Sequence, residues 1–115
     1  MEREASEKPV IVSESFKIRR KEIYAFGLEM FGFYQAEIYD HHIKKSLATL
    51  SSHYNVYPEC RFLATKNRIY RNIILDAHLI IYRITDQRIE VLDILHSASS
   101  IRKIQSIRKI KINNK

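Results

Sequence analysis

Apolar residues follow two different spacings along this chain, and each spacing predicts a different kind of element. Residues 10–12 (Val-Ile-Val) are a short β-branched run, which favours a first strand. Ser13 follows, and its hydroxyl can accept a hydrogen bond from a first-turn N–H, so it is expected to cap a helix over about 14–30. Gly32 can adopt the left-handed conformation that ends a helix, so this helix should break near it.

A second helix is expected after Gly32 because apolar side chains recur every three or four residues. This spacing places them on one face of a helix: Ala36, Tyr39, Ile43, Leu47, Leu50 and Tyr54. Pro58 marks the end of the pattern. Two helices joined by only a few residues lie antiparallel, so the sequence predicts a helical hairpin whose two apolar stripes need a surface to cover.

The second half of the chain has short apolar runs with the composition and spacing of β-strands. Four runs are present, at residues 61–64, 69–75, 78–85 and 89–96. The last three are separated by short polar turns, as antiparallel hairpins require. We therefore expect an antiparallel sheet.

Both faces of this sheet are expected to be apolar. In the third run, His78, Ile80, Tyr82 and Ile84 share one face, opposite Leu79, Ile81 and Arg83. In the last run, Glu90, Leu92, Ile94 and His96 share one face, opposite Ile89, Val91, Asp93 and Leu95. The helical hairpin can cover only one face, so the second apolar face indicates a partner.

Together these elements predict one α+β domain: a short N-terminal strand, an antiparallel two-helix hairpin packed on an antiparallel β-sheet, and a basic C-terminal tail. The expected bounds are 10–104 for the domain, with a flexible extension over 1–9 and the tail over 105–115. No apolar run is long enough to span a membrane, and the N-terminus lacks the apolar core of a secretory signal. We expect a cytoplasmic protein without membrane association.

The formal net charge of +7 is concentrated at the C-terminus. Residues 101–115 hold six basic residues and no acid, which leaves fourteen basic against thirteen acidic residues before them. This tail contains a near repeat, Ser-Ile-Arg-Lys-Ile, so it is either a helix with one apolar face or disordered until bound. Direct nucleic-acid binding is expected, if at all, only through the tail.

A second basic stretch, without acids, lies between Cys60 and Leu75. Its members and Arg83 are the candidates for binding a target: Arg61, Lys66, Arg68, Arg71 and Arg83. Cys60 is the only cysteine, which excludes an internal disulfide and a cysteine-based zinc site. The histidines at 41, 42 and 53 lack the i, i+4 spacing of a helical zinc pair, so we expect no metal and no cofactor.

Three motifs carry a resemblance to a known family. Residues 31–39 (Phe-Gly-Phe-Tyr-Gln-Ala-Glu-Ile-Tyr) contain an aromatic-Gly pair before Gln-Ala and Tyr. Arg71 stands seven residues before His78, which Leu-Ile-Ile-Tyr-Arg follows, and the last run, 89–96, ends in Leu-His. In this order and spacing, these motifs resemble the RelE/ParE superfamily of bacterial toxins, in its ParE-like branch.

The chain departs from the family pattern at two places. Arg19-Arg20 stand where the first helix usually has Asp-Leu, and Ser-Ala-Ser-Ser follows His96 where a basic run is common. The first departure leaves the packing of that helix open.

The resemblance implies the toxin of a type II toxin–antitoxin system that traps DNA gyrase in its cleaved-DNA state and is neutralised by a cognate, ParD-like antitoxin. The C-terminal segment of the antitoxin would wrap the toxin over the apolar second face of the sheet, and its acidic residues would suit the basic stretch at 61–71. The alternative is a RelE-like, ribosome-dependent mRNA endonuclease. A third reading is an inactive relative that keeps only antitoxin binding.

An endonuclease needs a base, an acid and cations that stabilise the phosphorane charge. In a RelE-like reading, the catalytic set would be Arg71, His78, Arg83 and His96. No aromatic residue and no second base closely follow His96, so we expect a gyrase inhibitor without catalytic residues rather than an enzyme. Structural roles compete for the same positions: Tyr82 as a core aromatic, and Arg83 paired with Glu90 or Asp93.

Overall fold

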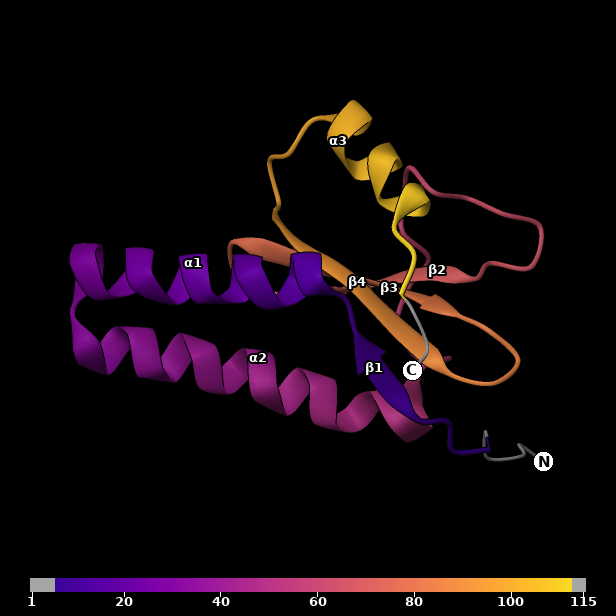
Figure 1. Cartoon of the computed structure of the whole chain (residues 1–115), viewed down its shortest axis with the longest axis horizontal. Coiled ribbons are helices and arrows are strands. Elements are labelled where there is room, and N and C mark those ends of the chain that lie inside the picture. Colours follow the sequence, from indigo (N-terminus) through magenta and orange to yellow (C-terminus); the bar gives the residue numbers. More distant parts are fainter. Residues whose placement is uncertain (1–5, 113–115) are drawn as a thin grey trace.

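The sheet lies between two helical layers (Figure 1). In the computed structural model, which describes residues 6–112, the strands are β1 (Val10–Val12), β2 (Tyr70–Ile74), β3 (His78–Ile84) and β4 (Ile89–His96), in the order β1-β4-β3-β2. Helices α1 (Glu14–Phe31) and α2 (Phe33–His53) cover one face. The short helix α3 (Ile101–Ser106) and the 3₁₀ turn η1 (Ile107–Lys109) cover the other. No helix within residues 6–112 is long and apolar enough to cross a membrane.

The predicted α+β class, with a helical hairpin on a sheet, is confirmed. β2, β3 and β4 form the expected antiparallel meander. β1 adds a parallel pair at the outer side of β4, with Val10 opposite Ile89, so the sheet as a whole is mixed.

Local sequence explains where the two helices begin and meet. The Ser13 hydroxyl accepts a hydrogen bond from the Phe16 N–H at 2.9 Å, which caps α1 as predicted. Gly32 has φ of +90°, a conformation that L side chains rarely adopt, and it separates the two helices. Gly27 faces Ala36 of α2, where an added Cβ would lie 3.4 Å from the Ala36 Cβ, so its small size lets the helices approach.

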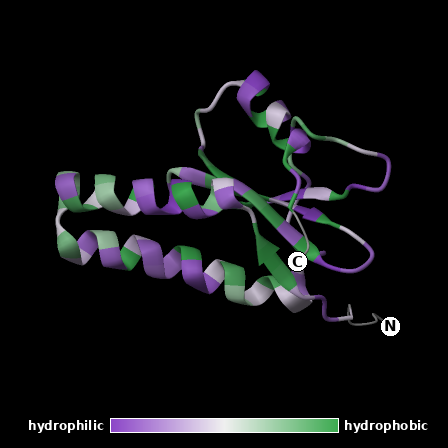
Figure 2. Ribbon diagram, viewed as in Figure 1, coloured by the Kyte–Doolittle hydropathy of each residue, from purple (hydrophilic) through white to green (hydrophobic). Residues whose placement is uncertain are grey.

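The first core lies between the hairpin and the sheet. Phe16, Ile43 and Leu50 of the helices are almost fully buried against sheet residues that include Ile80 and Tyr82. Figure 2 shows the apolar character of β1 and β4 along most of their length. The predicted stripe of α2 is therefore the face that it buries.

The second face of the sheet is covered by the chain itself, so the inference that its apolar residues need a partner to cover them is wrong. Residues 101–112, here called the strap, place Ile104 and Ile107 in a second core with Leu92 and Leu95 of β4. Ile110 and Ile112 also pack against it. The near repeat forms α3 and η1, with Ile104 and Ile107 pointing inward and Ile101 half exposed. Of the two alternatives left open by the sequence, the structure therefore has the helical one over residues 101–109.

The predicted strand at 61–64 does not form. The chain turns there instead, since the Leu63 N–H donates to the Cys60 carbonyl at 3.1 Å. Cys60 and Leu63 point inward as part of the second core. A single bridge between Glu59 and Arg71 is the whole of the β pairing of this loop with β2.

A β-bulge changes the faces predicted for β4. Ile81 is opposite Asp93 while Tyr82 is opposite Val91, so β4 holds one extra residue at Leu92. The alternation shifts by one residue there: Ile89 and Val91 face the hairpin before the bulge, and Ile94 does after it. The predicted grouping of Leu92 with Ile94 on one face is thus wrong.

The N-terminal extension is anchored over its described part. The Tyr54 hydroxyl donates to the Ser6 carbonyl at 2.8 Å, and the Lys8 N–H donates to the Ser51 carbonyl at 3.0 Å. The predicted flexibility of residues 1–5 lies outside the described residues.

Candidate functional site

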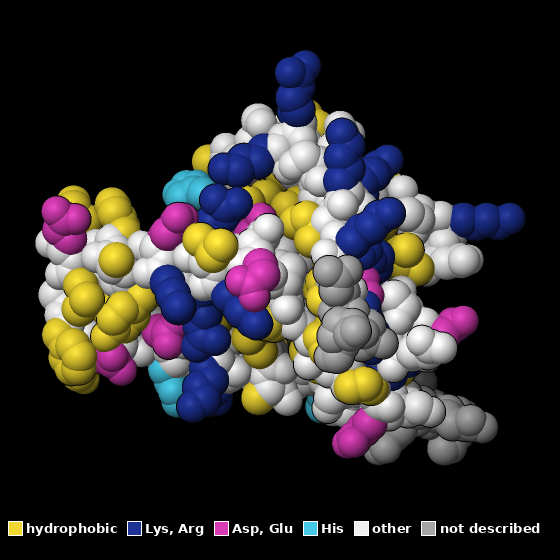
Figure 3. Space-filling model, in the orientation of Figure 1, with side chains coloured by type: hydrophobic (Ala, Val, Ile, Leu, Met, Phe, Trp, Pro, Cys, Tyr) yellow, Lys and Arg dark blue, Asp and Glu magenta, His cyan; other side chains and the backbone are white. Residues whose placement is uncertain are grey.

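The outer end of the helical hairpin carries a group of exposed, large apolar side chains. We call it the tip surface, and it consists of Phe26, Leu28, Met30, Phe31, Phe33 and Tyr34. Their exposed fractions run from 40% for Leu28 to 73% for Tyr34. Figure 3 shows these hydrophobic side chains gathered at the end of the molecule where α1 meets α2.

The tip surface is large for one chain. With aromatic side chains of about 150–250 Å² each, the exposed area is on the order of 600 Å². The largest apolar patch on a typical monomer is roughly 300–600 Å² and often marks an interaction site. The hairpin therefore offers a docking surface for another molecule.

A groove continues from the tip surface towards the sheet. Its volume is about 920 Å³, and Phe26 and Phe31 of the tip surface also line it. At the inner end it reaches Tyr39 of α2, together with His78 and His96 of the sheet. The groove and the tip surface thus form one continuous, largely apolar site.

His78 and His96 lie side by side at the inner end of this groove. They are directly opposite each other in the β3–β4 register, and their rings are 5.6 Å apart in an edge-to-face arrangement. The Tyr39 hydroxyl and Nδ1 of His78 are hydrogen-bonded at 2.7 Å. Burial lowers the pKa of His78 below 6.5, and repulsion from His96 lowers it further.

Two ion pairs explain how α1 accommodates the Arg19-Arg20 pair. Arg19 binds both carboxylate oxygens of the buried Asp93, at 3.2 and 3.1 Å, which ties α1 to β4. Arg20 binds both oxygens of Asp40, at 2.8 and 3.1 Å, which ties α1 to α2. Hydrogen bonding to Asp93 raises the pKa of Arg19 although burial opposes it.

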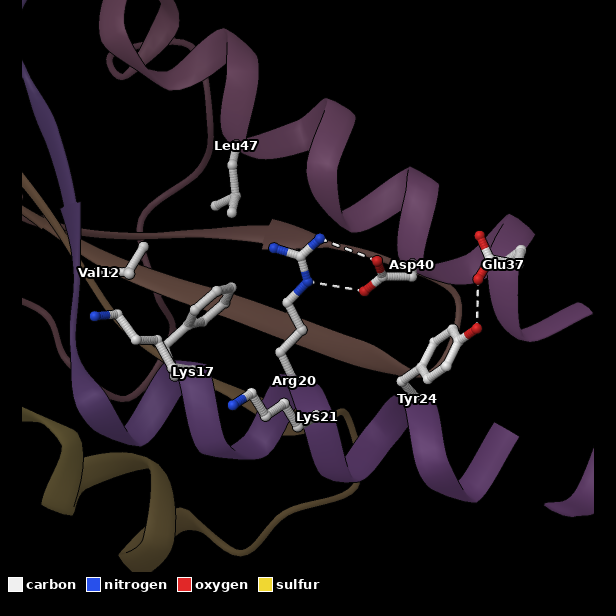
Figure 4. A pocket seen from close by; sticks show the side chains of 9 residues that line it. Val12, Lys17, Arg20, Lys21, Tyr24, Glu37, Asp40 and Leu47 are labelled. Carbon is white, nitrogen blue, oxygen red and sulfur yellow. Dashed lines mark hydrogen bonds and ion pairs between the residues drawn. The ribbon is translucent and has the colours of Figure 1, made fainter. Parts of the chain in front are cut away.

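Figure 4 shows the Arg20–Asp40 pair inside a second, shallower pocket of about 470 Å³ between β1 and the hairpin. In the same pocket, the Tyr24 hydroxyl donates to the Glu37 carboxylate. Arg20 binds Asp40 and Tyr24 binds Glu37, so these two pairs link α1 to α2 and leave the pocket few free polar groups for a ligand.

The four residues of the RelE-like set are not brought together. His78 and His96 share the hairpin face of the sheet. Arg83 lies on the strap face, where its guanidinium donates to the Ile110 carbonyl at 3.0 Å. Arg71 pairs with Tyr82 of β3. Tyr82 is four residues from His78 along the same strand, so the backbone positions of Arg71 and His78 are about 13 Å apart along the strand direction.

The side chain of Arg71 forms its hydrogen bonds with backbone carbonyl groups of this chain. Its guanidinium donates to the carbonyls of Arg68, Asn55 and Tyr57, at 2.8, 3.0 and 2.9 Å. These bonds tie the loop after α2 to β2. Of the candidates for target binding, Arg61, Lys66 and Arg68 are exposed, whereas Arg71 and Arg83 are partly buried.

Arg83 belongs to a network beneath the strap. The Arg83 guanidinium donates to one carboxylate oxygen of Glu90 at 2.7 Å, which is one of the two pairings predicted for Arg83. Arg88 donates to the other oxygen of Glu90 at 2.9 Å. Burial opposes the charge of Glu90, but the hydrogen bonds from Arg88 and Arg83 outweigh it and lower the pKa of the carboxyl. Arg88 also donates to the Ile112 carbonyl, so the network fastens the strap.

Sequence reasoning missed the tip surface. The signal was present, because residues 26–34 contain four aromatics around the helix break at Gly32. Helical spacing would place Phe26 or Gly27, and Met30, on one apolar face of α1 with Phe16 and Ile23, but Phe26 and Met30 are exposed. Within residues 6–112, no group of three or more potential ligands from His, Cys, Asp and Glu could hold a metal ion.

Comparison with known proteins agrees with this architecture. A family model described as the ParE toxin of the type II toxin–antitoxin system parDE matches residues 10–101. A solved structure described as the chromosomal ParDE system from P. aeruginosa has a similar fold, with a TM-score of 0.65 and 14% identity over 80% of this chain and 98% of that chain. Curated proteins give no significant sequence match. The family model covers most of the chain, which therefore belongs to the ParE toxin family of type II toxin–antitoxin systems.

Proposed function

We propose that this protein is a cytoplasmic toxin that inhibits DNA gyrase and is neutralised when a cognate antitoxin covers the tip surface and its groove. The observation that carries the proposal is the unpartnered apolar area at the end of the hairpin, which continues into a 920 Å³ groove. An area of this kind serves binding, whereas the polar residues that nuclease chemistry would require stand apart on two faces of the sheet.

The antitoxin is the better occupant of the tip surface for a physical reason. An exposed apolar area on the order of 600 Å² favours aggregation unless another chain covers it. An antitoxin made together with the toxin would cover this area from the start, whereas a target is met only after release. Because the strap already occupies the second face of the sheet, the hairpin is the apolar surface that remains accessible on the described part of the chain.

Inhibition of gyrase is supported by family membership and by the separation of the candidate catalytic residues. A gyrase poison needs a surface of suitable shape and no proton transfer. The RelE-like alternative would need Arg83 to reach a substrate beside His78, but Arg83 is bound to Glu90 and to strap carbonyls on the other face.

Two assays on the purified toxin test the proposal. Gyrase supercoiling of relaxed plasmid should be inhibited and cleaved DNA should accumulate, while mRNA in a translation extract stays intact. Addition of the cognate antitoxin should restore supercoiling. Ribosome-dependent mRNA cleavage that His96→Ala abolishes would overturn the proposal in favour of the endonuclease, and a lack of toxicity on expression without antitoxin would favour the inactive relative.

A further inference from the structure

Two basic segments that are distant in the sequence lie on one surface. Leu63 of the loop between α2 and β2 shares the second core with Ile104 and Ile107 of the strap. Packing on this common core places both segments on the strap side of the sheet, and we call the exposed cations of this side the basic face. It consists of Arg61, Lys66, Arg68, Arg102, Lys103, Arg108, Lys109 and Lys111.

The near repeat of the strap directs its cations outward. Ile104 and Ile107 are buried, so the Arg-Lys pairs at 102–103 and 108–109 are left on the solvent side, and all four side chains are exposed. The pairs are six residues apart in a helical segment, or roughly 10 Å. Figure 3 shows Lys and Arg side chains over the part of the molecule that holds α3 and the loop.

These charges are largely uncompensated. Of the eight, Arg68 is the one that forms an ion pair with an acid among the described residues, with Glu59 at 3.6 Å. Glu90, beneath the strap, does not neutralise these cations, because it is buried and already bound to Arg83 and Arg88. A cluster of unpaired cations attracts a polyanion strongly at low salt.

The composition of the surface selects the kind of polyanion. A protein segment usually docks through apolar or aromatic anchors, but the isoleucines of the strap are mostly used in the core. Single-stranded nucleic acids bind through exposed aromatic rings on which bases stack. The exposed aromatics of the described chain lie on the tip surface instead. Cations without such anchors suit the phosphates of a double helix, which carry one negative charge for about every 3.4 Å of helix axis on each strand.

We propose that the basic face binds the phosphate backbone of a nucleic-acid duplex without reading its sequence. The contact is distinct from the tip surface, so it leaves that surface free. It gives the protein a direct affinity for DNA that does not depend on gyrase.

Fluorescence anisotropy of the full-length toxin with a labelled DNA duplex, without gyrase or antitoxin, tests this proposal. Binding should weaken steeply as salt rises from about 50 to 200 mM, because counterions are released from neutralised phosphates. A variant with Arg102→Gln, Lys103→Gln, Arg108→Gln and Lys109→Gln should lose at least about tenfold in affinity and show a salt slope smaller by up to about four.

A matched variant controls for net charge. Lys17→Gln, Lys21→Gln, Lys44→Gln and Lys45→Gln remove the same charge from exposed positions on the hairpin and should change the affinity by less than about threefold. Equal losses in both variants, or no loss in either, would overturn the proposal. So would tighter binding to a single strand, or displacement of the duplex by polyglutamate at equal charge, which would assign the face to an acidic protein. Unchanged melting temperatures would show that both variants fold.

Discussion

The contact between Arg19 and Asp93 shows how one residue can depart from a family pattern without loss of the fold. Asp93 is 3% exposed and would be a buried, unpaired carboxylate without this arginine. Because Arg19 keeps about a third of its side chain in solvent, water screens part of the interaction. The pair thus links α1 to β4, and removal of Arg19 would leave the Asp93 carboxylate buried without its ion-pair partner.

Replacement of Arg19 by leucine should destabilise the protein by about 2 kcal/mol, less than the 3–5 kcal/mol for a fully buried pair. Urea unfolding followed by circular dichroism gives this value. Lys17→Leu is the matched control, since Lys17 pairs with Glu14 in solvent and should contribute less than about 0.5 kcal/mol. Equal effects of the two substitutions would contradict the structural role of the buried pair.

The lowered pKa of His78 predicts a dependence of stability on pH. The unfolded chain takes up a proton near pH 6.5, whereas folded His78 does so only at lower pH. The unfolded state therefore binds more protons below pH 6.5, and the free energy of unfolding falls as the pH falls through this range.

His78→Gln removes the titrating group and keeps a side chain that can bond to Tyr39. The variant should lose less stability between pH 7 and pH 5 than the original protein, as measured by urea unfolding at both pH values. Equal losses in the two proteins would show that His78 does not control this dependence.

At the residue level, the sequence predicts what depends on neighbours in the chain. The cap by Ser13 and the burial of Tyr82 follow from short-range chemistry, and both are observed. The closeness of His78 to His96 could not be predicted, because it depends on an extra residue in β4 that shifts the alternation. No local signal announces this bulge.

At the level of elements, the strap is the part whose role differs most from expectation. The basic composition of residues 105–115 predicted a tail outside the domain, but Ile107 of that segment is in the second core together with Ile104. Cationic side chains on one side and apolar ones on the other describe a short amphipathic segment. Composition alone hides this arrangement because the strap holds as many cations as isoleucines, five of each.

The near repeat supplies an internal control for the strap. Ile107→Ala should destabilise the protein by about 2–4 kcal/mol because it leaves a cavity in the second core. Ile101→Ala, at a half-exposed position of the same repeat, should cost less than about 1 kcal/mol. Urea unfolding compares the two, and similar small effects would mean that the strap is not held in place in solution.

The loop at 59–69 was predicted as part strand because its residues have strand composition. In the structure, Cys60 and Leu63 enter the core from a turn, and Arg71 fixes the preceding loop through carbonyl groups. Cys60 and Leu63 are thus buried in a turn, although a strand could have buried the same apolar residues. Sequence composition could not distinguish between the two.

On the scale of the whole molecule, the two surfaces of interest are separated. The hairpin extends along the 45 Å long axis and ends in the tip surface, while the loop at 61–68 lies at the other side of the sheet (Figure 1). An apolar site at one end of the molecule and a basic face on the strap side of the sheet can serve different partners at the same time.

Substitution of one aromatic residue on the tip surface should weaken antitoxin binding selectively. Phe33→Asp should raise the dissociation constant by about 30-fold or more, since an interface aromatic commonly contributes about 2 kcal/mol. Isothermal titration calorimetry with the cognate antitoxin measures the change. Val56→Asp, at an exposed position outside the tip surface, is the control and should bind normally; a loss at Val56 alone would move the interface elsewhere.

The pairing of β1 with β4 has a consequence for the order in which this chain folds. Val10 and Ile89 are partners although they are 79 positions apart in the sequence, and the Ser13 N–H donates to the Val91 carbonyl. Such contacts have a high sequence separation, and their loop-closure entropy slows folding. The helical hairpin can form locally as the nascent chain emerges, but its apolar stripes find their sheet only after β4 has been synthesised. An incomplete chain therefore cannot present the finished toxin surface.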